Sequence, residues 1–181
     1  MKKLFVVLAL AAFLAAGTAF ADHPDGFGVG VQGGGGGGWE GGGFGFYRGA
    51  SLSLKIPNVP VFWAIDLEIN KYFFGLGVSG DFYFVDAALV KDIGLNWYIG
   101  FGVGVGLGFY NGDWPGDDNL WLRVVARLPV GLSWQLPINA GPLDAFEVYL
   151  QVVPSLGVAI VPEFHFPAGG WPINIGLRLW F

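Results

Sequence analysis

Apolar and polar residues alternate with a period of two along most of the chain. The clearest stretch is Leu95–Tyr110, where every odd position is a large apolar residue and five of the even positions are glycine. Side chains with this period lie on opposite faces of a β-strand, whereas in a helix they would spread around the whole circumference. Each glycine would also cost a helix about 1 kcal/mol relative to alanine. The pattern therefore predicts strands with one continuously apolar face.

The alternation recurs often enough to predict eight strands. Several of them run 11 to 16 residues, the length that a tilted strand needs to cross the hydrocarbon of a membrane, whereas strands of soluble domains usually have about 5–6 residues. An even number of such strands favours an all-β fold, a transmembrane antiparallel up-and-down β-barrel. A soluble β-sandwich is the alternative, because half-buried strands alternate too. The expected strands are Phe27–Val31, Ala50–Ile56, Val59–Ile69, Phe74–Phe84, Leu95–Tyr110, Leu120–Gln135, Phe146–Ile160 and Trp171–Phe181.

The connections between these strands indicate an orientation. In bacterial barrels the short turns and both chain ends face the periplasm, and the longer loops face outward. The glycine run Gly33–Gly38 lacks the Lys-Ser/Thr ending of a phosphate-binding loop, so we interpret it as part of a flexible loop. The expected periplasmic turns are 57–60, 91–94 and 136–144, and the expected outer loops are 33–43, 70–72, 111–119 and 161–169.

The first 21 residues are typical of a secretory signal peptide. Lys2 and Lys3 precede a short apolar run, and Ala19-Phe20-Ala21 offers a small-x-small cleavage site. Cleavage after Ala21 would leave residues 22–181 as one barrel domain, with His23 in an exposed N-terminus. An uncleaved membrane anchor is the alternative.

Composition excludes several other classes of protein. Hydrophobic residues make up 54% of the chain, yet the part after residue 21 has no run of about 18 apolar residues with helical character. Without Lys2 and Lys3, seven of the nine basic residues remain against 14 acidic ones, a formal charge of −7 that argues against a nucleic-acid partner. Cysteine is absent, which excludes disulfides, thiolate metal sites and a lipidated N-terminus. No cofactor and no metal site is expected.

Large aromatic residues are expected at both rims of the barrel, pointing outward. Such girdles mark the interfaces of a membrane, where an amphipathic ring sits at the level of the headgroups. The expected girdle comprises Trp97, Trp134, Phe146 and Phe181 at one rim and Phe74, Phe109 and Trp171 at the other.

The last eight residues, 174–181, resemble the terminal assembly signal of outer-membrane barrels. Asn174, Gly176, Leu179 and Phe181 match its polar, glycine, hydrophobic and aromatic positions, and the resemblance implies recognition by the barrel assembly machinery. Over residues 22–181 the pattern is similar to small barrels of the OmpA/OmpX/OmpW type. The stretches 128–134 and 167–172 resemble a group of spirochaetal outer-membrane barrels. These resemblances imply an outer-membrane location with lipid around the barrel, and they supply no catalytic residues.

Seven charged residues fall on the inward face of the predicted strands. An eight-stranded barrel has an interior just wide enough for side chains to fill it, and buried charges persist when they are paired. We therefore expect a network that plugs the lumen, with a selective conduit as the alternative. The inward glycines between Gly100 and Gly108 either admit bulky partners such as Trp121 and Tyr149 or leave a cavity. The expected network comprises Asp66, Glu68, Asp81, Arg123, Arg127, Glu147 and Arg178.

Catalytic and metal-binding interpretations find little support. His165 is expected near the outer rim without a serine beside it, because Ser155 faces inward, and a general base must lie within reach of its nucleophile. Asp113, Asp117 and Asp118 lack the spacing of a calcium loop. The sequence thus predicts a non-enzymatic barrel with a structural or surface-interaction role, whose ligand it does not identify. The alternative is a narrow channel for small or apolar solutes.

Overall fold

The computed structural model describes residues 23–38, 49–69, 73–110, 120–161 and 163–181. The predicted signal peptide lies outside these ranges, as do residues 39–43 of the predicted outer loop 33–43 and all of loops 70–72 and 111–119, including its three aspartates. No helix within the described ranges is both long and apolar enough to cross a membrane.

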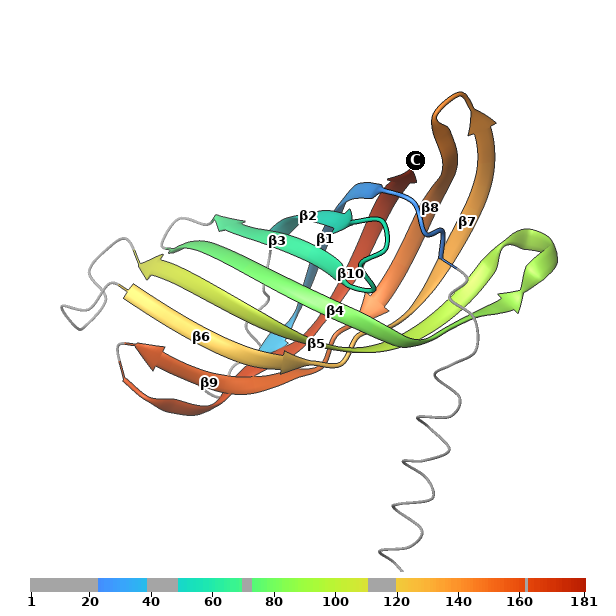
Figure 1. Cartoon of the computed structure of the whole chain (residues 1–181). Coiled ribbons are helices and arrows are strands. Elements are labelled where there is room, and N and C mark those ends of the chain that lie inside the picture. The colour runs from blue at the N-terminus through green and yellow to red at the C-terminus, as the bar shows by residue number, and fades with distance from the viewer. Residues whose placement is uncertain (1–22, 39–48, 70–72, 111–119, 162) are drawn as a thin grey trace, which may run out of the picture.

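The described strands form one closed antiparallel sheet (Figure 1). Each strand pairs with its neighbours in the sheet, and the pairing of the first strand with the last closes the ring. A 3-10 turn, η1 (Lys91–Ile93), lies between β4 and β5, the fourth and fifth strands along the chain. The strands are β1 (Gly28–Gly38), β2 (Gly49–Lys55), β3 (Phe62–Ile69), β4 (Phe73–Val90), β5 (Leu95–Tyr110), β6 (Leu120–Arg127), β7 (Val130–Ala140), β8 (Leu143–Val152), β9 (Ser155–Val161) and β10 (His165–Trp180).

These ten segments correspond to eight strands of the barrel, because β6 and β7 are two halves of one long strand, as are β8 and β9. Each of these long strands is interrupted at a proline. β6 and β7 both pair with β5, and β8 and β9 both pair with β10. Proline has no N–H to donate to a ladder, yet the carbonyls of Pro129 and Pro154 still accept hydrogen bonds from Gly100 and Leu128, at 2.8 Å each. The eight-stranded antiparallel barrel predicted from the alternation is confirmed.

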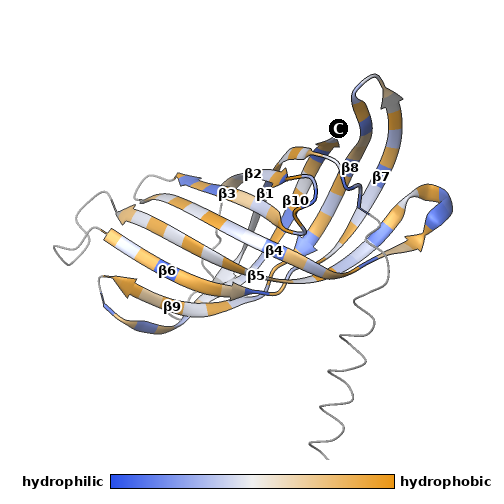
Figure 2. Ribbon diagram, viewed as in Figure 1, coloured by the Kyte–Doolittle hydropathy of each residue, from blue (hydrophilic) through white to orange (hydrophobic). Residues whose placement is uncertain are grey.

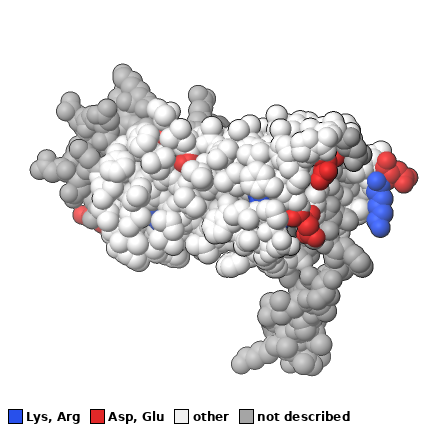
Figure 3. Space-filling model, turned by 45° about the horizontal axis from the view of Figure 1, so that its top comes forward, with Lys and Arg blue, Asp and Glu red and all other residues white. Residues whose placement is uncertain are grey.

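The two faces of the barrel differ as the alternation predicts. Along β5, Phe101, Val103 and Val105 are exposed on the outside, whereas Tyr98 faces the lumen and is buried. Figure 2 shows the resulting bands of apolar and polar residues along the strands. Uncharged side chains cover most of the surface seen in Figure 3, and its few charged side chains gather mainly at one end. The outside therefore presents apolar surface to its surroundings, as lipid-facing strands do.

The two ends of the barrel are named here by their connections. The turn end carries both termini of the barrel and the connections β2–β3, β4–β5 and β7–β8, and the loop end is opposite (Figure 1). At the turn end the backbones of Phe27 and Phe181 exchange two hydrogen bonds of 2.8 Å, which extends the closure to the last residue. The long hairpins β4–β5 and β7–β8 project beyond the other strands at this end.

The glycine run is a strand, not the predicted loop. β1 continues to Gly38 and pairs along this length with β10. A Cβ atom at Gly34 would meet the carbonyl oxygen of Ile173 and the side chain of Asn174, so the close approach of β10 requires glycine there. Glycine thus permits this pairing where propensity alone predicts flexibility.

Three other predicted boundaries are wrong. β10 begins at His165, inside the predicted loop 161–169, and β4 continues to Val90 rather than ending at Phe84. β7 and β8 shorten the predicted turn 136–144 to Gly141 and Pro142. Gly141 has a φ of 63°, a conformation that favours glycine in a tight turn.

Candidate functional site in the barrel lumen

A layer of buried charges lies across the lumen at the turn end. It comprises His23, Asp86, Glu147 and Arg178, and we call it the His23 layer. His23 precedes β1, and its side chain is only 2% exposed. Its Nδ1 lies 2.7 Å from Asp86 Oδ2 and its Nε2 lies 2.9 Å from Glu147 Oε1, while its backbone N–H donates to the same Asp86 oxygen. His23, which precedes β1, therefore enters the barrel and lies across its end.

This geometry defines the charge of His23. A carboxylate oxygen accepts hydrogen bonds, so both ring nitrogens donate here, and they do so together only in the imidazolium form. Burial by itself would lower the pKa of His23, but the neighbouring Glu147 carboxylate and the hydrogen bonds to Asp86 and Glu147 outweigh burial and raise the pKa to about 9. His23 is therefore a cation at neutral pH.

Glu147 is the acceptor at the centre of the layer. Its Oε2 accepts hydrogen bonds from Arg178 and from the indole of Trp180, both at 2.8 Å, while Oε1 faces His23. Arg178 donates a further bond of 2.8 Å to Ser53. Desolvated charges are tolerated when they are paired and hydrogen-bonded in this way.

Aromatic rings enclose the cationic ring of His23. Phe62, Tyr83, Tyr98 and Trp180 have ring centroids 5.1 to 5.9 Å from that of His23. Tyr83 stacks between Phe62 and Tyr98, with centroid distances of 4.2 and 4.4 Å. Charges and rings together thus pack the lumen at the turn end.

Neutral hydrogen bonds connect side chains further along the lumen. Tyr98 donates to Gln151 at 3.0 Å, Tyr149 donates to Gln32 at 3.0 Å, and Gln151 donates to Gln32 at 3.3 Å. At a similar depth the guanidinium of Arg127 forms a bidentate ion pair with Asp81, at 2.9 and 3.0 Å. Such bidentate pairs hold a fixed geometry.

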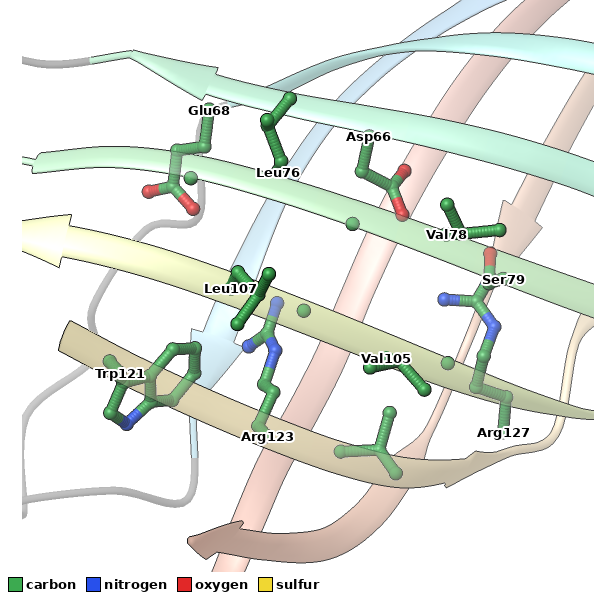
Figure 4. A pocket seen from close by; sticks show the side chains of 15 residues that line it. Asp66, Glu68, Leu76, Val78, Ser79, Val105, Leu107, Trp121, Arg123 and Arg127 are labelled. Carbon is green, nitrogen blue, oxygen red and sulfur yellow. The ribbon is translucent and has the colours of Figure 1, made fainter. Parts of the chain in front are cut away.

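A recess lies between this level and the loop end (Figure 4). Asp66 and Glu68 project into it from β3, and Arg123 and Arg127 project from β6. Gly75 and Gly77 on β4 and Gly104 and Gly106 on β5 line it between these two sides. We call this space the charged recess.

The structure places the seven predicted lumen charges in two ion pairs and in the charged recess, which Arg127 also lines. Glu147 pairs with Arg178, and Asp81 pairs with Arg127. Asp66, Glu68 and Arg123 belong to the charged recess.

Sequence reasoning missed His23 and Asp86. His23 was predicted to be exposed, but it is buried. The sequence does not reveal this, because its partners Asp86 and Glu147 are 63 and 124 residues away along the chain. Asp86 was missed because the β4–β5 register shifts between Tyr83 and Val85, which changes the face that the following residues occupy.

The predicted girdle residues occupy both ends of the outer surface. Trp134, Phe181, Phe74, Phe109 and Trp171 are exposed, while Trp97 and Phe146 are half-buried. The indole of Trp134 donates a hydrogen bond of 2.7 Å to the carbonyl of Ile93. Phe74 and Phe109 stand opposite each other on β4 and β5.

The terminal motif has structural contacts of its own. Gly176 faces the ring of Tyr149, which a Cβ atom would overlap, and Asn174 lines the charged recess. Leu179 and Phe181 are exposed on the outside. His165 is exposed as well. Within the described ranges no three His, Asp or Glu side chains gather as a metal site.

Neither a protein-family model nor a curated protein sequence matches this chain. Among solved structures, the crystal structure of Neisserial surface protein A (NspA) is similar over 86% of this chain and 97% of that protein, with 14% identical residues and a TM-score of 0.47. The closure of the barrel rests on the strand pairings of this chain itself.

Proposed function

We propose that this chain is an outer-membrane barrel with a structural or surface-interaction role and a lumen closed to solutes. The single observation that carries the proposal is the His23 layer, in which Glu147, Arg178 and Trp180 are each 3% exposed or less. Packed, paired charges at this depth act as a plug, because a solute could pass only by separating charges from their partners.

Planar-bilayer recording tests the closed lumen. The refolded protein, added at rising concentration, is expected to leave the conductance at baseline, while a porin added to the same bilayer gives discrete steps. Reproducible steps from the wild-type barrel would overturn the proposal.

A narrow channel is the second candidate function, and the charged recess favours it. Charged side chains on opposite sides of a lumen also occur in selective pores. In this chain a conduit would continue past Arg127 and Asp81 and through the His23 layer, so it requires displacement of His23. Conductance that appears only after such displacement would support a gated channel.

The same proposal includes location and partners. The apolar outside suits the lipid of the outer membrane, and residues 1–21 would direct export before cleavage. The terminal motif would bind the assembly machinery through the exposed Leu179 and Phe181. No nucleic acid, cofactor or catalytic reaction belongs to this proposal.

A Phe181→Ala variant tests the motif, because it should slow assembly in cells while leaving refolding in detergent intact.

A further inference from the structure

Asp86 differs from the other buried carboxylates of the lumen in having one oxygen without a hydrogen-bond donor. Both oxygens of Glu147 and both oxygens of Asp81 accept bonds from described side chains. Asp86 is only 5% exposed. Its Oδ2 accepts two bonds from His23, but no donor among the described residues reaches its Oδ1. A buried charged oxygen without a donor is costly, so a further donor at Oδ1 would stabilise the His23 layer.

The described chain begins beside this carboxylate. The backbone N–H of His23 donates to Asp86 Oδ2 at 3.2 Å. Asp22 itself lies outside the described residues, but only three covalent bonds join its amino nitrogen to the nitrogen of His23, a span of less than about 4 Å. A group on the Asp22 nitrogen is therefore within reach of the Asp86 carboxylate.

Cleavage after Ala21 would change the charge of that nitrogen. In the uncleaved chain it belongs to the peptide bond between Ala21 and Asp22, where it is neutral and carries one N–H. Hydrolysis of this bond adds water, leaves a carboxylate on Ala21 and leaves an α-amine on Asp22, which is mostly protonated at neutral pH. The resulting ammonium has three N–H donors, and hydrogen bonds between ionised partners are about twice as strong as neutral ones. Cleavage thus creates a cation next to Asp86.

We propose that the α-ammonium of Asp22, released by cleavage after Ala21, forms a buried ion pair with Asp86 and completes the His23 layer. Asp86 then accepts from the ammonium through Oδ1 and from His23 through Oδ2. Asp22 also carries its own carboxylate, so the new N-terminus adds no net charge to the lumen. This inference rests on the proposed cleavage and goes beyond it, because it makes the cleaved N-terminus a part of the packed lumen.

The ion pair would make the barrel sensitive to the position of its N-terminus. One additional residue before Asp22 moves the ammonium by up to about 3.8 Å and restores a neutral amide at the original position. A chain that keeps residues 1–21 has the same neutral amide. The lumen is therefore fully paired only in the processed chain, which couples closure of the barrel to removal of the signal peptide.

The rate at which the α-amine is acylated tests the ion pair directly. A chain that begins at Asp22 is refolded in detergent and pulse-labelled at pH 7 with an acetyl N-hydroxysuccinimide ester, and the labelled peptides are quantified by mass spectrometry. Only an uncharged, accessible amine reacts, so the α-amine should react at least tenfold more slowly in the folded barrel than in the urea-unfolded chain. Lys91 is the internal reference, because it is exposed in the fold.

Matched chains separate the ion pair from burial alone. Asp86→Asn removes the charge with little change in size, and a chain with one glycine added before Asp22 moves the ammonium without altering any side chain. In each, the α-amine should lose most of its protection, whereas Asp25→Asn, an exposed neighbour, should keep it. Heat-modifiable migration confirms that each chain is folded. If Asp86→Asn does not fold, the glycine-extended chain still decides.

The cleavage and the ion pair fail in distinguishable ways. The mass of the protein purified from membranes gives its N-terminus, and a first residue other than Asp22 would overturn the proposal at the cleavage step. An α-amine that reacts equally fast in the folded and unfolded chain would overturn the ion pair while leaving the cleavage and the closed lumen in place. Protection that persists in the glycine-extended chain would also overturn it.

Discussion

Replacing His23 by alanine tests whether the residues before β1 are part of the folded barrel. The change removes the imidazolium from between Asp86 and Glu147. Glu147 keeps its bonds to Arg178 and Trp180, but Asp86 loses both the ring and the charge that faced it. Removing one partner of a buried pair typically costs about 3–5 kcal/mol, because the remaining charge stays desolvated.

The pKa of His23 supplies an independent magnitude. Its ordinary value is 6.5 and its value in the folded barrel is about 9, a difference that corresponds to about 3 kcal/mol. Because the folded pKa is the higher one, this stabilisation is complete below pH 6.5 and is lost as the pH rises through about 9. The other charged groups near the ring are Asp86, Glu147 and Arg178.

The assay is urea unfolding in lipid, followed by tryptophan fluorescence and heat-modifiable migration at pH 6, 7.5 and 9.5. Wild type should lose about 3 kcal/mol between the lowest and highest pH, whereas His23→Ala should be weaker at pH 6 and nearly flat over this range. His165→Ala is the matched control, because that histidine is exposed. A wild-type stability that does not fall between pH 6 and 9.5, or a His23→Ala profile parallel to it, would refute the assignment.

Three further perturbations test the faces, the ion pair and the seam of the barrel. Val103→Arg, on the exposed outside, should cost about 2–4 kcal/mol by urea unfolding in lipid, while inward Gly104→Ser should cost less, since its Cβ would meet only side-chain atoms at 3.2 Å or more; equal costs would contradict the assignment of the two faces. Arg127→Met should cost about 3–5 kcal/mol in the same assay by leaving Asp81 unpaired, and an unchanged midpoint would show that this pair does not stabilise the lumen. Gly34→Val should abolish heat-modifiable migration, because its side chain would overlap β10, and a normally folded variant would contradict the β1–β10 register.

The positions of the strands and their two faces were predictable, because whether a side chain faces the outside or the lumen restricts its residue type independently of its neighbours. An outward position must be apolar and an inward position must fit the lumen. The residue type at each position of Leu95–Tyr110 therefore indicates whether its side chain points outward or into the lumen. The register inside a strand follows from that period without knowledge of its partners. Eight strands and their two faces could therefore be derived from the chain alone.

Strand ends and breaks depend on partners, and there the sequence was a weaker guide. The glycines at 33–38 have no side chains, so their sequence shows no alternation that would indicate a strand. They form a strand because they pair with β10 and β2. Pro129 and Pro154 interrupt the regular pairing of their strands, but the barrel strand continues past each of them because their carbonyls still accept hydrogen bonds from the neighbouring strand. Neither outcome is encoded in local propensity.

The balance of acidic and basic side chains in the lumen is consistent with the burial of His23 as a cation. Among the described inward side chains the acids are Asp66, Glu68, Asp81, Asp86 and Glu147, and the basic residues other than His23 are Lys55, Arg123, Arg127 and Arg178. The acids therefore exceed those basic residues by one, and an uncompensated charge in a packed interior is costly. The imidazolium of His23 balances the difference. The bulge in β4 turns Asp86 inward, and His23, from the segment before β1, supplies the cation that pairs with it.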